Sequence, residues 1–200
     1  MIKQNIGFFD ACSREMDESG TKLVFRSRVV PIGEKLNKLY DIASTRNIPI
    51  LFTTCCAGRM PEKNVMPDVL FIPMDTNNNE WVKNVKNYHQ FYIQKNPDSE
   101  REPQLSYICE YHDAFKHNSN AIRLIEMLDI SHWIAFGNGF DFCVTTGIRT
   151  LVKMKKKVTL ITDVLIRATD GTDENYNNLM EEFHNLGVYT TTLEELLKSL

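Results

Sequence analysis

One cysteine lies where its thiol could be chemically active. Cys143 follows an apolar run, residues 133–136, that breaks at Gly137-Asn138-Gly139, and a helical pattern begins there. A thiol at a strand-to-helix junction meets the unpaired amides and the positive dipole end of the helix, which favour the thiolate. We therefore predict that Cys143 is a nucleophile, with the glycine-rich turn bringing backbone amides to an oxyanion on the substrate. The alternative is a buried, inert cysteine that serves as a small hydrophobic side chain.

Two charged residues follow other apolar runs in the same way. Asp10 comes directly after residues 6–9, and Lys95 follows residues 91–94. In an open parallel sheet, ligands bind beyond the carboxyl ends of the strands, so we expect both residues to share one rim with Cys143. A carboxylate can take the thiol proton, and an ammonium group can stabilise the thiolate and a tetrahedral anion. Taken singly, the aspartate could be a turn residue and the lysine a solvated charge.

The elements that must position these groups alternate between short β-rich runs and helical patterns. This alternation is typical of βαβ units and predicts an α/β fold, with three layers and a mostly parallel sheet of about six strands. The expected strands are 6–9, 50–53, 69–72 as a short extra strand, 91–94, 132–136, 158–162 and 188–190. The expected helices are 32–46, 118–128, 143–155, one capped by Thr172 or Asp173 and stopped by Gly187, and one capped by Thr191 or Thr192 that runs through Leu197.

Bulk composition limits the class of protein. The 200 residues carry a net charge of −3 and 42% hydrophobic residues, which suits a single domain spanning residues 1–200. The slight acidic excess argues against a nucleic-acid or membrane partner, because a polyphosphate surface needs clustered Lys and Arg. The N-terminal sequence does not resemble a secretory signal, and the five cysteines have no regular spacing. We therefore expect a cytoplasmic protein with a small-molecule substrate.

A family resemblance adds to this interpretation. The stretch 136–144, FGNGFDFCV, resembles the nucleophile motif of the isochorismatase-like cysteine hydrolases, the superfamily that includes nicotinamidases. Phe8-Phe9-Asp10 resembles the family's first strand with its catalytic aspartate, and Ile93-Gln94-Lys95 resembles the strand that ends in the catalytic lysine. Further similar segments are Asp113-Ala114-Phe115 with Asn118 and Asn120, residues 158–163 as a strand ending in Asp163, and residues 187–195 at the C-terminal end.

The resemblance implies a Rossmann-like isochorismatase fold and a role for each site residue. Asp10 would accept and donate the proton, Lys95 would be its electrostatic partner, and Cys143 would form a thioester-like intermediate. Backbone amides near Gly139 and at Cys143 would form the oxyanion hole. Asn138, Gly139 and Phe140 are the expected oxyanion and substrate-binding residues, with a cis peptide bond between Asn138 and Gly139. A homo-oligomer is also implied by the resemblance alone.

The chain departs from the family pattern at three places. A long polar insertion separates Lys95 from Asp113, so Lys116 remains an alternative cation, and an ungapped match would select Cys109, which cannot be one. After the aspartate stands Ala11-Cys12-Ser13-Arg14-Glu15 in place of the family's Gln, Asn, Asp and aromatic residue, and Cys12 either packs or lines the pocket.

The third departure concerns the metal. Nicotinamidases bind a metal through an aspartate and two histidines after the second strand, whereas this chain has Thr53-Thr54-Cys55-Cys56 there and no histidine before His89. Vicinal cysteines with no nearby histidine do not suit a tetrahedral zinc site. We therefore expect no metal and no cofactor, and we interpret the histidines as surface or satisfied core residues.

The prediction is a metal-independent cysteine hydrolase acting on a small amide, carbamoyl or related bond. The alternative is a catalytically silent relative that binds a small molecule or a protein. A nucleotide-binding Rossmann domain is a weaker third interpretation, because the last glycine of the fingerprint is missing after Gly137-x-Gly139.

Overall fold

A parallel β-sheet forms the centre of the molecule. The computed structural model describes residues 5–16, 22–54, 66–73, 77–94, 118–167 and 171–200. The sheet has seven strands in the order β5-β6-β4-β1-β7-β8-β9, and each pair of neighbouring strands is parallel. The strands are β1 (Ile6–Ala11), β4 (Ile50–Thr54), β5 (Val69–Ile72), β6 (Gln90–Gln94), β7 (His132–Asn138), β8 (Lys157–Ile166) and β9 (Tyr189–Thr191).

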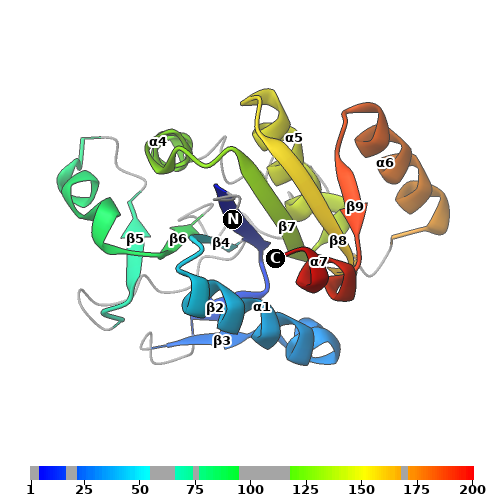
Figure 1. Ribbon diagram of the computed structural model, residues 1–200, viewed down its shortest axis with the longest axis horizontal. Coiled ribbons are helices and arrows are strands. Elements are labelled where there is room, and N and C mark those ends of the chain that lie inside the picture. The colour runs from blue at the N-terminus through cyan, green and yellow to red at the C-terminus, as the bar shows by residue number, and fades with distance from the viewer. Residues whose placement is uncertain (1–4, 17–21, 55–65, 74–76, 95–117, 168–170) are drawn as a thin grey trace, which may run out of the picture.

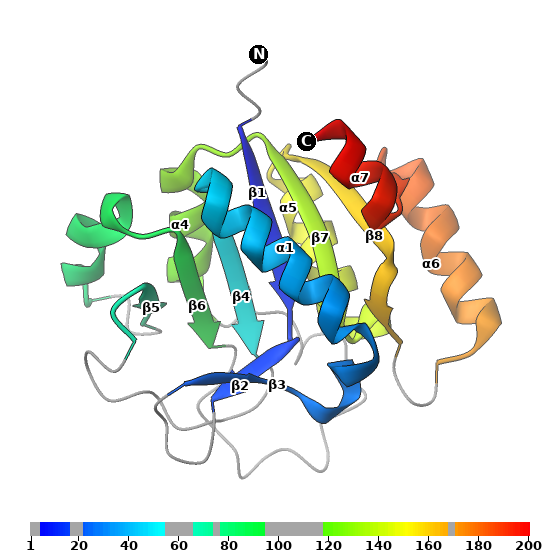
Figure 2. The same cartoon turned by 60° about the horizontal axis from the view of Figure 1, so that its bottom comes forward.

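Helices cover both faces of this sheet (Figure 1). One face is covered by α4 (Ser119–Leu128), α5 (Thr145–Lys153) and α6 (Asp173–Asn185). The other face is covered by α1 (Gly33–Arg46) and α7 (Leu193–Ser199), which lie in front of the sheet in Figure 2. A small antiparallel hairpin, β2 (Arg14–Met16) with β3 (Leu23–Phe25), lies at the edge to which the strand arrows point. The predicted three-layer α/β fold is therefore confirmed.

Two separate hydrophobic cores follow from the alternation of side chains along the strands. In β1, Phe8 packs into the core under α1 and α7, while Phe9 packs into the core under α4, α5 and α6. In β7, Ile134 and Ala135 divide in the same way. Because the inner strands are buried on both faces, they read in the sequence as continuous apolar runs.

The sheet has seven strands where about six were expected, because both short outer segments predicted as strands, β5 and β9, pair with their neighbours. The structure also adds elements that the sequence patterns did not predict. The hairpin β2–β3 and two 3₁₀ segments, η1 (Ser27–Ile32) and η2 (Glu80–Asn87), also went unpredicted. The caps were predicted correctly: Thr172 accepts a hydrogen bond from Asn175 N, and Thr192 forms a capping box with Glu195.

The end of β8 was predicted wrongly. Asp163 does not terminate the strand but lies inside it, where the register with β7 shifts between Ala135 and Gly137. Its carboxylate accepts hydrogen bonds from Lys35 Nζ at 2.8 Å and from Leu193 N at 2.7 Å, joining β8 to both α1 and α7. Burial acts to raise the pKa of Asp163, but these donors outweigh it and hold the pKa below its usual range. The aspartate is an anchor between layers rather than a strand-ending residue.

In the described parts of the chain, no helix is long and apolar enough to cross a bilayer.

The close packing of α5 on β1 generates a prediction at Gly147. A β-carbon at Gly147 would lie 2.2 Å from Cε1 of Phe9, whose ring is 1% exposed and has no room to move. We expect Gly147→Ala to lower the free energy of unfolding by about 1–3 kcal/mol through overpacking. Helix propensity alone predicts the opposite sign, a gain of about 1 kcal/mol.

Chemical denaturation measures this change, and Gly33→Ala is the matched control. A β-carbon at Gly33, also in a helix, would meet its nearest atom at 3.9 Å, an ordinary contact. The control should keep or raise stability. If Gly147→Ala were as stable as the control, the close approach of α5 to β1 would not be a constraint on this fold.

Candidate functional site

Cys143 lies in a one-turn π-helical segment, η4 (Phe140–Val144), between β7 and α5. The residue before this segment, Gly139, adopts a left-handed conformation with φ of 76°. Its carbonyl accepts hydrogen bonds from the amides of Phe142 and Val144, which wraps the chain tightly around the cysteine. The helix that the sequence predicted from residue 143 therefore begins at residue 140. Cys143 is 3% exposed at this turn.

Gly137 allows the ends of β1 and β7 to approach each other. It has φ of 123°, and a β-carbon there would lie 2.4 Å from the carbonyl oxygen of Ala11. Only glycine fits such a conformation and such a contact. The same β-carbon would lie 2.9 Å from Oδ1 of Asp10, so this carboxylate oxygen rests directly against Gly137.

Gly139 has a corresponding relation to the thiol. A β-carbon at Gly139 would lie 3.2 Å from Sγ of Cys143. Oδ1 of Asp10 therefore lies at Gly137, near the end of β7, and Sγ of Cys143 lies at Gly139, the residue after that strand. The two predicted site residues approach glycines two positions apart in the chain, Asp10 from β1 on the α1 side and Cys143 from the core on the opposite face.

Asp10 is buried deeply. It is 1% exposed and lies in register between Phe52 of β4 and Phe136 of β7. The hydroxyl of Tyr40, from α1, donates to Oδ2 at 2.6 Å. Burial raises the pKa of Asp10, and Ser13, Tyr40 and the charge of Arg14 offset this only partly. Burial therefore favours the protonated form of this carboxyl group more than water does.

Arg14 holds Tyr40 from its other side. Its guanidinium carbon lies 3.9 Å from the centroid of the Tyr40 ring and 5.3 Å from the centroids of both Phe25 and Phe52. A cation over an aromatic face is attracted by the ring quadrupole. The hairpin β2–β3, helix α1 and strand β4 are thus joined around the ring that donates to Asp10.

Asn138 and Gly139, expected at the oxyanion site, make structural hydrogen bonds. The amide of Gly139 donates to Ile166 O at 2.9 Å, and Asn138 Nδ2 donates to Cys12 O at 3.4 Å. The expected cis peptide bond between Asn138 and Gly139 is wrong, since none of the described peptide bonds is cis. The left-handed Gly139 makes the turn instead. Cys12, itself at φ 56°, is fully buried in the core, in keeping with a packing role.

Phe140 packs into the core beneath α6. Its ring lies 5.1 Å from the Tyr176 ring and 6.0 Å from the Phe183 ring, centroid to centroid, and the residue is fully buried. Its carbonyl accepts a hydrogen bond from Thr145 Oγ1 at 2.6 Å. The side chain therefore anchors the π-helical turn to α6 instead of lining a pocket as expected.

Lys95 lies outside the described residues, as do Lys116, Cys109 and the pair Cys55-Cys56. The description of β6 ends at Gln94. That strand pairs with β4, which pairs with β1, so its carboxyl end is two strands from Asp10 on the same edge of the sheet.

The His, Cys, Asp and Glu side chains that the structure describes do not form a metal centre. Within the described residues, no three His, Cys, Asp or Glu side chains are gathered in a way that could hold an ion. His89 is exposed, and His132 forms a 2.8 Å hydrogen bond with Thr159 Oγ1, as expected for surface and satisfied core histidines. His112 and His117 lie outside the described residues.

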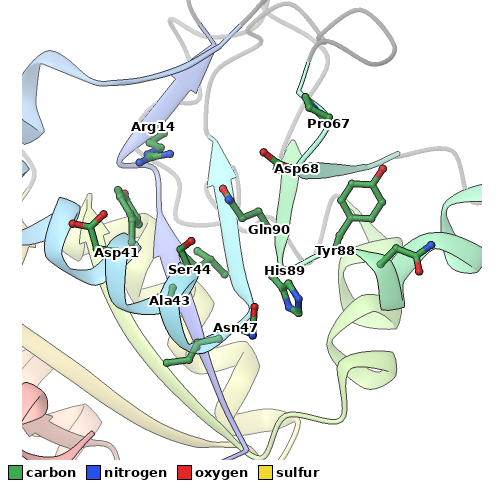
Figure 3. A pocket seen from close by; sticks show the side chains of 14 residues that line it. Arg14, Asp41, Ala43, Ser44, Asn47, Pro67, Asp68, Tyr88, His89 and Gln90 are labelled. Atoms are coloured by element: carbon green, nitrogen blue, oxygen red, sulfur yellow. The ribbon is translucent and has the colours of Figure 1, made fainter.

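A polar groove adjoins this region (Figure 3). Its cavity of about 520 Å³ lies between α1 and the segments leading into β4, β5 and β6. Arg14 and Tyr40 line it along with Asp41, Asp68 and His89. Sequence reasoning missed Arg14 and Tyr40 as site residues. The sequence did contain one indication: Tyr40, whose ring carries a polar hydroxyl, lies on the apolar side of the helix predicted at 32–46.

Known proteins resemble this chain in structure but not in sequence. No protein-family model matches the sequence, and no curated protein matches it. Among solved structures, the zinc-bound pyrazinamidase of Pyrococcus horikoshii is similar with a TM-score of 0.59 and 10% identity, over 94% of this chain and 99% of that one.

Two further solved structures are similar over nearly the whole chain. An isochorismatase-like hydrolase from Alkaliphilus metalliredigens has a TM-score of 0.56 and 15% identity, over 97% of this chain and 96% of that one. The N-carbamoylsarcosine amidase of Thermoplasma acidophilum has a TM-score of 0.51 and 10% identity, over 94% and 95%. At these identities the likeness concerns the fold. The chain therefore has the fold of the isochorismatase-family structures, as its sequence motifs predicted.

Proposed function

We propose that this protein is a metal-independent cysteine hydrolase that acts on a small amide, carbamoyl or related carbonyl compound. The observation that supports the proposal is that Asp10 Oδ1 lies against Gly137 and Cys143 Sγ against Gly139, two positions apart at the end of β7. A buried carboxyl group and a thiol near the same strand end are the two kinds of group that nucleophilic catalysis by a cysteine uses. The amidases of the same fold are consistent with this class of substrate.

The reaction cycle follows from the two groups. Asp10 takes the proton from the Cys143 thiol, and the sulfur attacks the carbonyl carbon to form a tetrahedral anion. Asp10 then gives the proton to the leaving nitrogen, the carbon–nitrogen bond breaks, and a thioester remains on Cys143. Asp10 next takes a proton from water, whose oxygen attacks the thioester, and the acid product leaves as the thiol regains a proton.

The anion needs donors other than the amide of Gly139. That amide already donates to Ile166 O, and the amides of Phe142 and Val144 donate to Gly139 O. We assign the oxyanion to the positive end of the segment that continues into α5, where backbone amides and the helix dipole favour an anion, as the family resemblance implies for the turn at Cys143. Lys95, at the carboxyl end of β6, is the proposed cation.

The absence of a suitable donor set in the sequence supports the metal-independent form. Where nicotinamidases have an aspartate and two histidines, this chain has Thr53-Thr54-Cys55-Cys56. The proposed cycle accordingly uses only side chains and backbone of this chain.

One set of observations favours the alternative, a silent relative that binds a ligand or a protein. Cys143 is only 3% exposed, and the Gly139 amide is engaged in a structural hydrogen bond. A protein of this kind would retain the fold and the groove beside α1 without turning over any substrate. The reactivity of the Cys143 thiol distinguishes the hydrolase from the silent relative.

The first test measures that reactivity. We expect Cys143, followed by peptide mass mapping during iodoacetamide labelling, to react well below the pH of an ordinary thiol, whose pKa is about 8.5. In a panel of amides, carbamates and vinyl ethers, turnover should fall at least about 10³-fold in Cys143→Ala and Cys143→Ser. Labelling at the rate and pH of a free thiol, with no turnover in the panel, would favour the silent relative.

The second test concerns the carboxyl group. Because the pKa of Asp10 is raised, the folded state favours the neutral carboxyl group over the charged one. The stability that the neutral carboxyl group contributes is lost as the pH rises through the folded-state pKa. Asp10→Asn removes that loss and keeps an acceptor for Tyr40. We expect no turnover, together with a melting temperature a few degrees above that of the wild type at pH 8, since 1 kcal/mol corresponds to about 2–4 °C at this size.

The advantage of Asp10→Asn should shrink as the pH falls, because the wild-type carboxyl group then becomes neutral as well. Asp41→Asn, the same change on the exposed side of α1, is the control and should leave the melting temperature within about 1 °C at every pH. If the melting temperatures of Asp10→Asn and the wild type differed by the same amount at every pH from 5 to 9, this would argue against a site that disfavours the charged carboxyl group.

A further inference from the structure

The two oxygens of Asp10 have different surroundings. Oδ2 accepts the Tyr40 hydroxyl at 2.6 Å from the α1 side of the sheet. Oδ1 rests against Gly137, near the end of the strand that leads to Cys143. The two oxygens of Asp10 are therefore not equivalent, because Oδ2 accepts from Tyr40 and Oδ1 does not.

We propose that Tyr40 is a positioning residue for the reaction: its hydroxyl binds Oδ2 and so directs Oδ1 toward the thiol of Cys143. This inference rests on the proposed cysteine hydrolase function. Rotation of the carboxyl group about its Cβ–Cγ bond would exchange the two oxygens, and the hydrogen bond to Tyr40 opposes that rotation. One carboxylate oxygen, Oδ1, then always acts as the base, because the two oxygens cannot exchange places.

Tyr40 is itself fixed in place. Arg14 stacks on one face of its ring at 3.9 Å, the Phe25 ring lies stacked with it at 6.0 Å, and the Phe52 ring lies tilted at 5.7 Å. These contacts come from the hairpin β2–β3 and from β4. The sequence that departs from the family pattern after the aspartate, Ala11 to Glu15, thus supplies the arginine that holds the tyrosine.

The same groups control when Asp10 is charged. The titratable and charged side chains that act on it in the described chain are Tyr40 from α1 and Arg14 from β2, with Ser13 as a polar neighbour. Each of them lowers the pKa of Asp10 against the larger effect of burial. Removing the Tyr40 hydroxyl should therefore raise the pKa of Asp10 further, so that the carboxyl group loses its proton only at a higher pH.

The test uses Tyr40→Phe, which keeps the ring for Arg14 and removes one oxygen. We expect kcat at neutral pH to fall about 10-fold with little change in KM, because proton transfer is impaired and binding is not. The acidic limb of the kcat/KM profile and of Cys143 labelling should move to higher pH. Arg14→Gln should move it in the same direction, since a positive charge near the carboxylate is lost.

Tyr189→Phe is the matched control, because it makes the same chemical change at a ring that is 65% exposed on β9. Its profile should coincide with that of the wild type. A purely structural role for Tyr40 would lower the amplitude of the Tyr40→Phe profile without moving its midpoint, and that result would overturn the inference.

A direct titration separates this inference from the proposed function. The carboxyl carbon of Asp10, followed by ¹³C NMR, should titrate at higher pH in Tyr40→Phe than in the wild type. An unchanged midpoint overturns the positioning role even if Cys143 is active. If the midpoint moves but wild-type Cys143 labels like an ordinary thiol, the hydrolase proposal fails, and with it the role of Tyr40 as the residue that aims a base.

Discussion

The candidate site depends on the close approach of β1 and β7 at their carboxyl ends. Gly137, without a side chain and at φ 123°, packs against the carbonyl oxygen of Ala11, and any β-carbon would push the two strands apart. Because the strands stay close, the carboxyl group of Asp10, one residue before the end of β1, lies against Gly137 of β7. Asp10 and Cys143, separated by more than 130 positions in the sequence, thereby approach glycines that are two positions apart.

The layers of the fold support Asp10 and Cys143 from different sides. Asp10 is held from the α1 side, where Tyr40 and Arg14 connect it to the hairpin. Cys143 is held from the opposite side, where Phe140 anchors its turn against α6 and Gly147 lets α5 lie close to β1. A reaction at the turn would thus combine a base oriented by one layer with a nucleophile oriented by the other. Rigid supports of this kind are what preorganised catalysis requires.

Much of the fold was predictable because its inner strands are buried on both faces and alternate with amphipathic helices. Residues 69–72 form the predicted strand with the same bounds, and Thr172 and Thr192 cap their helices as expected. The errors lie where a local pattern does not set the outcome. Asp163 appeared to end β8 because a charged residue follows an apolar run, but Lys35 and the Leu193 amide accommodate its charge inside the strand. The hairpin β2–β3 has two strands of only three residues each, which are too short to show a clear period-2 signal.

The amino-acid sequence alone determined the fold class and the approximate position of most strands and helices, and it nominated Asp10 and Cys143 as candidates, because these follow from local periodicity and from the residue type after each apolar run. It did not decide which atoms meet. The trans turn at Asn138-Gly139, the use of the Gly139 amide by Ile166 and the Tyr40 hydrogen bond to Asp10 each join segments distant in sequence. The physical reason is that such contacts depend on how layers pack and on strand register, which no window of neighbouring residues encodes.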